Sequence, residues 1–135
     1  ERPASPFVAG FIGESTLIEG TAQRASDGSL ALMPAGAPGL SLPGSGGIGS
    51  GEAATMVLRP EKIVVRPAED GAAGLPARVV DVVYVGDVTR LALALADGVV
   101  MTAKLANRRD FYRPALGDQV KVAWSPEEAL VLARR

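Results

Sequence analysis

Few residues of this chain are suited to catalysis, and two of the usual types are missing. The 135-residue sequence contains no cysteine and no histidine. This excludes thiolate nucleophiles and the imidazole that most often serves as general base or metal ligand. The carboxylates include two adjacent pairs, Glu69–Asp70 and Glu127–Glu128. Adjacent side chains on a strand point to opposite faces, so neither pair is placed to flank one scissile bond, and we interpret both as solvated.

One glycine-rich segment matches a cofactor-binding motif by its letters. Residues 44–49 read Gly-Ser-Gly-Gly-Ile-Gly, which fits the G-x-G-x-x-G pattern of dinucleotide-binding loops. Such a loop follows a buried strand and opens a helix. Here Pro43 precedes the segment, and a β-like run, 55–58, follows it. No Gly-Lys-Ser or Gly-Lys-Thr of a phosphate-binding loop occurs either. We therefore expect no catalytic residue, no cofactor site and no metal site.

The elements that carry these residues are predicted to be short β-strands. Hydrophobic residues make up 47% of the chain and aromatic residues only 4%, with 16 glycines and 10 prolines, a balance that favours strands and turns over helices. Residues 78–105 read as three strands, joined at Gly86–Asp87 and at the hairpin signal Asp97–Gly98. Leucines at every second position would line one face of the middle strand: Leu91, Leu93 and Leu95. Alanines occupy its other face: Ala92, Ala94 and Ala96.

Further strands are expected at 14–24, 29–33, 55–58, 63–66, 119–124 and 130–132. Together they predict about eight or nine short strands, which is typical of a β-barrel or sandwich. Residues 34–52 are almost wholly Gly, Pro, Ser and Ala, and predict a long flexible loop.

Several positions have a type and place that indicate a structural or contact role. Pro60 forces a turn that Arg59 and Glu61 flank, which predicts either a structural turn or a contact surface for a partner subunit. Trp124 ends an alternating strand and is expected in the core, and Tyr84 is expected to pack with its hydroxyl bonded to a partner. The candidate structural or subunit-contact residues are Arg59, Pro60, Glu61, Tyr84, Gly86, Ala92, Ala94 and Trp124.

The first residues predict a short apolar helix. Ser5 is a capping residue, Pro6 suits the first helical position, and Gly13 suits the end. Its apolar side chains are spaced four apart: Phe7, Phe11, Val8 and Ile12. Because so short a helix is not stable alone in water, it must pack either on its own β domain or against another domain. The chain starts at Glu1 without Met, and we expect it to be part of a longer protein.

Charge and hydropathy exclude further classes. The net charge is −1 and the pI is about 5.5, so no basic stripe for nucleic acid is expected. No run approaches the roughly 20 apolar residues of a membrane span, and no signal peptide is visible.

Four segments, in order along the chain, resemble the C-terminal part of ABC-importer ATP-binding subunits. Residues 7–14 look like the segment that leaves the nucleotide-binding domain, and residues 56–61 look like the Leu-Arg-Pro-Glu turn of these proteins. Residues 84–87, followed by 97–98, resemble their central hairpins, and 117–127 resemble their closing strand. The pattern looks most like the polyamine and ferric-iron branch, which is related to the maltose type.

The resemblance implies an all-β TOBE domain, an OB-like β-barrel with a short N-terminal helix. Residues 1–13 would be a linker helix from an absent nucleotide-binding domain, and 14–135 the β domain, whose Gly/Pro-rich stretch at 34–52 departs from the family. ATP and Mg²⁺ would bind in the absent domain and not here. The implied role is non-catalytic regulation and dimerisation, in the cytoplasm at the inner face of the bacterial membrane. The implied partners are a second copy of the ATPase subunit, its own nucleotide-binding domain and, indirectly, the permease subunits.

Two other functions remain open from the residues. A related OB-like module could bind a small oxyanion through backbone amides with Arg78, Arg90 or Lys104. An RNA-binding OB module would need a basic face with aromatic residues, which the acidic pI argues against. The alanine face of the middle strand is expected to pack closely on another strand or on the sister subunit.

Overall fold

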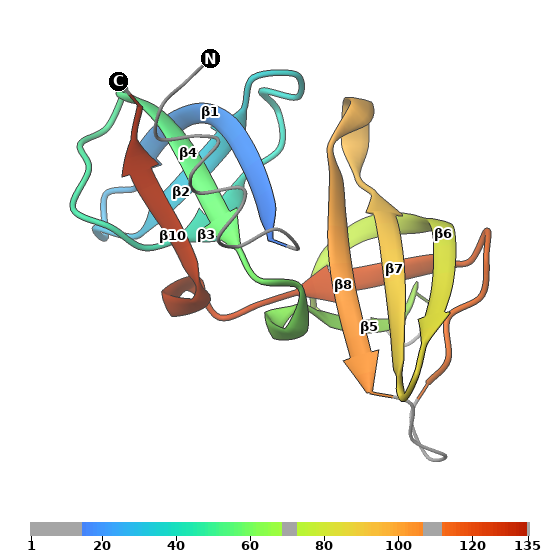
Figure 1. Cartoon of the computed structure of the whole chain (residues 1–135). Coiled ribbons are helices and arrows are strands. Elements are labelled where there is room, and N and C mark those ends of the chain that lie inside the picture. The colour runs from blue at the N-terminus through green and yellow to red at the C-terminus, as the bar shows by residue number, and fades with distance from the viewer. Residues whose placement is uncertain (1–14, 69–72, 107–111, 135) are drawn as a thin grey trace.

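The computed structural model describes residues 15–68, 73–106 and 112–134, which are mostly β-strand and turn. Ten strands and three 3₁₀ turns lie within these ranges (Figure 1). The strands are β1 (Thr16–Arg24), β2 (Leu30–Pro34), β3 (Leu42–Gly44), β4 (Ala53–Leu58), β5 (Val64–Pro67), β6 (Leu75–Val85), β7 (Val88–Ala94), β8 (Val100–Ala106), β9 (Gln119–Ala123) and β10 (Ala129–Ala133). The 3₁₀ turns are η1 (Pro60–Lys62), η3 (Ala96–Gly98) and η4 (Pro126–Glu128).

The strands form two five-stranded sheets, which are separate lobes in Figure 1. The first sheet has the order β10-β4-β1-β2-β3 and curls so that its two ends meet. There, Ser45 N–H donates to the Ala129 carbonyl at 2.8 Å, and Val131 N–H donates to the Ser45 carbonyl at 2.8 Å. The second sheet has the order β5-β9-β6-β7-β8, with a β-bulge between Val79 and Asp81 in β6.

The two halves of the chain repeat one another. Residues 51–65 correspond without a gap to residues 117–131, an offset of 66 positions, as from Pro60 to Pro126. Gly51 and Gly117 both have φ of 90° at the start of the repeat. The hydrogen bonds repeat too: Ala22 N–H donates to the Glu52 carbonyl at 2.9 Å, and Val79 N–H donates to the Asp118 carbonyl at 3.0 Å. Each half therefore supplies one set of five strands, β1–β5 and β6–β10.

The halves exchange their fifth strands. β5 pairs with β9 in the second sheet, whereas β10 pairs with β4 in the first. The chain crosses between the lobes at η1, the green coil between them in Figure 1, and at η4, the red coil below the first lobe. Trp124, at the second crossing, donates from Nε1 to the Pro43 carbonyl in β3 at 2.7 Å. At the first crossing η1 packs on β8, and Thr102 N–H of β8 donates to Thr16 Oγ1 of β1 at 3.0 Å.

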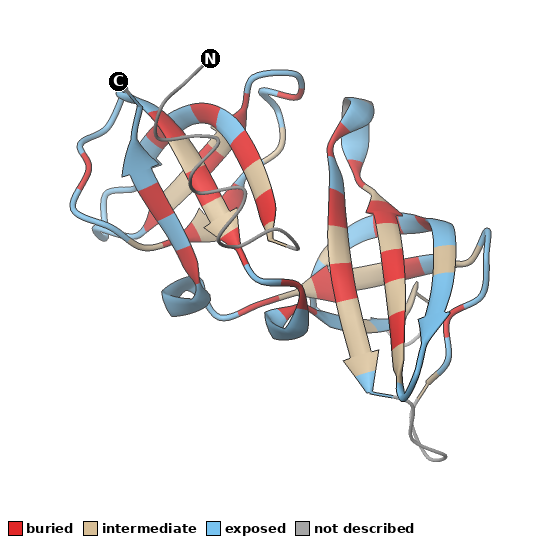
Figure 2. Cartoon of the chain, viewed as in Figure 1, coloured by how far each residue is buried: buried red, intermediate tan, exposed pale blue. Residues whose placement is uncertain are grey.

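The core confirms the alternation read from the sequence. Inward and outward residues alternate along β1, β7 and β8 (Figure 2). Leu91, Leu93 and Leu95 are all buried, as predicted, and Trp124 is buried as well. The buried side chains of both lobes form one continuous hydrophobic cluster through the crossings. This continuity, with the exchanged strands, means that neither lobe can be completed without the other half.

The all-β, OB-like prediction is confirmed, but two details differ. The described strands number ten and form two sheets, not one barrel of eight or nine strands. The stretch 34–52 is not a loop throughout: it contains β3, and Ala37, Leu42 and Ile48 are buried. Its glycines permit close packing, since a Cβ on Gly44 would lie 2.7 Å from Val131 Cγ2 and one on Gly46 2.5 Å from the Val131 carbonyl oxygen. The helix predicted at 1–13 and the pair Glu69–Asp70 lie outside the described residues.

Candidate functional site

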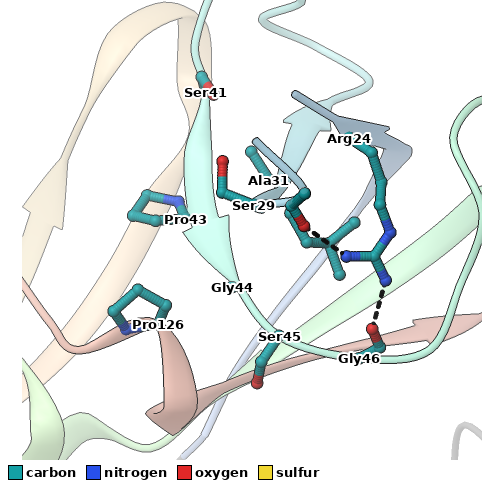
Figure 3. A pocket seen from close by; sticks show the side chains of 11 residues that line it. Arg24, Ser29, Ala31, Ser41, Pro43, Gly44, Ser45, Gly46 and Pro126 are labelled. Atoms are coloured by element: carbon teal, nitrogen blue, oxygen red, sulfur yellow. Dashed lines mark hydrogen bonds between the residues drawn. The ribbon is translucent and has the colours of Figure 1, made fainter. Parts of the chain in front are cut away.

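An open pocket of about 450 Å³ lies on the outer side of β2 and β3 in the first lobe (Figure 3). The β1–β2 turn, the residues after β3, and Pro126 of η4 also line it. In OB folds the face of strands 2 and 3, with the loops beside it, is the usual place for ligands. The pocket therefore occupies the position at which this fold most often binds something.

Arg24 is the charged group among the described residues that line this pocket. Its Nη1 donates to the Gly28 carbonyl at 2.8 Å, and its Nη2 donates to the Gly46 carbonyl at 2.6 Å, as Figure 3 shows. These bonds hold the guanidinium in one orientation and leave it further donors, because the group carries five N–H bonds. Ser29, Ser41 and Ser45 add hydroxyl groups to the lining. The Ser29 hydroxyl donates to Asp27 Oδ1 at 2.7 Å, and the Ser45 hydroxyl donates to the Ala129 carbonyl at 3.5 Å.

Asp27 lies next to this lining and reduces its positive potential. Ser29 donates to Asp27 Oδ1 from both its backbone N–H, at 2.9 Å, and its hydroxyl, at 2.7 Å. These hydrogen bonds, the backbone one first, hold the pKa of the Asp27 carboxyl below its ordinary value. The carboxylate therefore stays ionised near neutral pH beside Arg24.

The basic residues expected to bind an oxyanion lie elsewhere. Arg78, Arg90 and Lys104 are on β6, β7 and β8 of the second lobe, and none lines the pocket. Arg90 and Lys104 are directly opposite one another, and Arg78 is opposite Ala94. Sequence reasoning missed Arg24. Two features of the sequence could have indicated this residue. Arg24 lies just before the Asp27–Gly28 turn, and the glycine-rich segment 44–49 offers backbone carbonyls that a side chain can approach closely.

The predicted turn at Arg59-Pro60-Glu61 is present as η1, with Pro60 buried. Arg59 and Glu61 approach to 4.0 Å, but both side chains are at least half exposed, so their attraction is weak. A second ion pair joins Lys62 of η1 to Glu128 of η4 at 3.9 Å. These two residues occupy equivalent positions of the repeat, 62 and 128. The two crossings therefore meet as a pair related by the internal repeat.

The predicted contact residues on β6 and β7 differ in their exposure to solvent. Tyr84 was expected to pack, yet it is 71% exposed, and Val83 and Val85 beside it are also exposed. These three residues lie beyond the β-bulge in β6, at the end of the strand next to the turn at Gly86, whose φ is 61°. On β7, Thr89 is directly opposite Tyr84 and is buried. Ala92 and Ala94 are half-buried on the outer face of β7, and Ala96 is exposed.

Within the described parts of the chain, no group of three or more Asp or Glu residues is placed to hold a metal ion. The same residues include no helix long and apolar enough to cross a membrane.

Comparison with known proteins places this fold in a family. Residues 56–132, more than half of the chain, match the model described as "TOBE domain". The relatives include the "Spermidine/putrescine import ATP-binding protein PotA" of Rubrobacter xylanophilus, 34% identical over 98% of this chain and 35% of that protein. The protein of the same name from Frankia alni is 36% identical over 98% of this chain and 31% of its own length. The corresponding protein of Nitrosomonas europaea is 36% identical, over 97% and 38%. The chain thus spans about a third of the length of these curated relatives.

A solved structure agrees with the architecture. The cytoplasmic molybdate-binding protein ModG superposes with a TM-score of 0.74 over 88% of this chain and 96% of its own, at 12% identity. At that identity the likeness concerns the fold alone. Together with the sequence match over β4 to β10, it leads to one conclusion: this chain belongs to the TOBE-domain family.

Proposed function

We propose that this chain is the non-catalytic regulatory and dimerisation domain of the ATP-binding subunit of an ABC importer, of the polyamine or ferric-iron type. The observation that carries the proposal is the match of nearly the whole chain to import ATP-binding proteins of which it spans only about a third. ATP and Mg²⁺ would bind in the remaining part of such a subunit. The subunit would work at the inner face of the bacterial membrane, with its permease subunits.

The exchanged strands suit this role. An ATPase pair that opens and closes needs a part that stays together and keeps its shape. Here, β5 and β10 tie each lobe to the other half of the chain, and one hydrophobic cluster runs through both crossings. Such a domain would pass the movement of one subunit to the other with little change in its own structure.

The non-catalytic part of the proposal is tested by nucleotide binding. The chain should neither bind nor hydrolyse ATP, whereas a full-length relative with its nucleotide-binding domain should do both. Calorimetry with ATP and Mg²⁺ on both proteins measures this difference. Micromolar ATP binding by the chain itself would overturn the proposal.

The dimerisation part is tested at the alanine face of β7. Ala94→Glu places a carboxylate directly opposite Arg78, so the fold should tolerate it, while a close contact with a second copy should not. We expect at least a tenfold loss of self-association by sedimentation equilibrium, with an unchanged circular dichroism spectrum. Thr21→Glu, on the exposed face of β1, is the matched control and should pair like the parent. Equal association of all three proteins would show that the alanine face is not the contact.

A second candidate is a small-oxyanion-binding module, which the Arg24 pocket at the usual OB ligand face favours. Calorimetry with molybdate, tungstate, phosphate and spermidine would separate this function from the first. Arg24→Gln and Ser41→Ala should each weaken binding of an oxyanion held in this pocket. Ser41→Ala is the cleaner variant, because Arg24 also bonds two carbonyl groups of the fold. No heat with any of the oxyanions would remove this candidate.

A further inference from the structure

The pocket beside β2 and β3 is larger than an inorganic oxyanion needs. Its volume of about 450 Å³ lies within the range of sites for small organic molecules, about 300–1,000 Å³. A tetraoxoanion would fill only about a third of this volume, at about 30 Å³ for each water-sized atom. A ligand that fills the pocket must therefore have an organic body besides its charged group.

The polar groups of the lining suit one negative charge better than two. Arg24 is held by two backbone carbonyls and keeps further N–H groups for a ligand. The hydroxyls of Ser29 and Ser45 already donate to other groups of the protein. The Asp27 carboxylate, which is bonded to Ser29 next to the lining, repels a second negative charge. A single carboxylate, which an arginine can bind through two N–H groups, fits these conditions.

The other side of the pocket is apolar. In Figure 3, Pro43 and Pro126 lie on one side of β3 and Arg24 lies on the other. Ala31 of β2 is directly opposite Pro43, so their side chains share the outer face of the sheet. Pro126 belongs to η4, which packs on β3. Two proline rings beside a small alanine provide a surface for an aromatic ring, since proline and aromatic side chains pack well together.

We propose that this pocket binds an aromatic carboxylate, with the carboxylate at Arg24 and the ring against Pro43 and Pro126. This ligand class rests on the second candidate function, an anion held at Arg24, and is narrower, because the ligand is organic and singly charged. A ligand in this position touches both β3 and η4, the crossing that leads into β10. Its binding therefore stabilises the closure of the first sheet, where Ser45 and Ala129 are bonded.

Trp124 reports on this side of the pocket. It is the only tryptophan of the chain, and it precedes Pro126 by two residues. Its Nε1–H donates to the Pro43 carbonyl at 2.7 Å, so it is bonded to one of the two prolines that would contact the ring. Nitrogen-labelled protein gives a single indole N–H resonance, which a ligand against both prolines should shift until the site is saturated. The amide resonance of Val79, in the second lobe, should not move.

The test titrates the protein with naphthoate, with naphthalenemethanol as its neutral analogue, and with molybdate. We expect naphthoate to shift the Trp124 resonance with a dissociation constant below about 1 mM, and the other two compounds to bind at least tenfold more weakly. Molybdate binding as tight as that of naphthoate would overturn the aromatic ligand class and leave the second candidate function standing. No response to either anion would overturn both.

Variants test the two ends of the pocket separately. Arg24→Gln should weaken naphthoate at least tenfold and leave the weak binding of the neutral alcohol unchanged, whereas a disrupted fold would weaken both. Ala31→Phe places a ring where the ligand's ring would lie and should also weaken naphthoate at least tenfold. Met33→Phe is the matched control, because Met33 lies two positions along the same face of β2 and outside the lining. Naphthoate binding that is equal in the parent and in folded Ala31→Phe would overturn the proposal.

Discussion

A cavity made in one lobe should destabilise the other lobe equally. Leu93 of β7 is 0% exposed, between Val79 of β6 and Met101 of β8. Leu93→Ala removes three carbons from this site, where rigid sheet neighbours limit collapse, so we expect a loss of about 3 kcal/mol in the free energy of unfolding. The melting temperature should fall by about 10 °C in one transition, because a chain of this size loses about 3 to 4 °C per kcal/mol.

Amide hydrogen exchange tells whether the loss is shared. The repeat provides matched reporters, the amides of Ala22 in the first lobe and Val79 in the second. Each donates to the carbonyl of the residue directly before a neighbouring strand, Glu52 before β4 and Asp118 before β9. If exchange requires global unfolding, a loss of about 3 kcal/mol speeds both amides about 150-fold. Leu116→Ala, at a 68% exposed position, should leave both rates unchanged.

The reasoning depends on the exchanged strands. Since β5 and β10 each complete the lobe built mainly by the other half, one lobe cannot open and leave the other intact. Acceleration of Val79 alone, with Ala22 exchanging as in the parent, would show that the lobes unfold independently. That result would refute the coupling, whatever the value of the melting temperature.

Three further predictions concern the crossings and the pocket rim. Trp124→Phe removes the donor to the part-buried Pro43 carbonyl and should cost about 1 kcal/mol, measured by urea unfolding with far-UV circular dichroism. Lys62→Glu should cost at most about 1 kcal/mol, because its half-exposed partner Glu128 is screened by solvent, and the charge-swapped double variant with Glu128→Lys should recover the loss in the same assay. The lowered pKa of Asp27 means that its hydrogen bonds stabilise the fold above pH 3.8, its ordinary value, and that this contribution disappears as the pH falls through the lower folded pKa. Asp27→Asn should therefore lose less melting temperature than the parent between pH 5 and pH 2, and equal losses would contradict the assignment.

Local pattern was enough to predict much of this fold. Alternation of leucines placed Leu91, Leu93 and Leu95 inside the second lobe, and the same alternation placed Trp124 in the core. Period-two patterns are reliable because side chains on a strand point alternately to opposite faces, whatever the strand pairs with. The missing histidine and cysteine likewise restricted the possible chemistry without any structure.

The repeat could have been read from the sequence as well. Gly51, Pro60 and Glu61 recur as Gly117, Pro126 and Glu127 at a constant offset. That signal predicts two similar five-stranded units in place of one barrel with more strands. The pocket at Arg24 was less accessible to such reasoning, because residues far apart in the sequence line it and only the folded sheet brings them together.

What the amino-acid sequence determined by itself is therefore the β class, the inward faces and the forced turn at Pro60. Only the tertiary structure decided which strands pair. A strand pattern specifies a buried face, but backbone hydrogen bonds are the same for every partner, so nothing local assigns β5 to the second sheet or β10 to the first. The same limit applies to Gly44. Read from the sequence, its lack of a side chain suggests a flexible backbone, whereas in the fold it permits close contact with Val131.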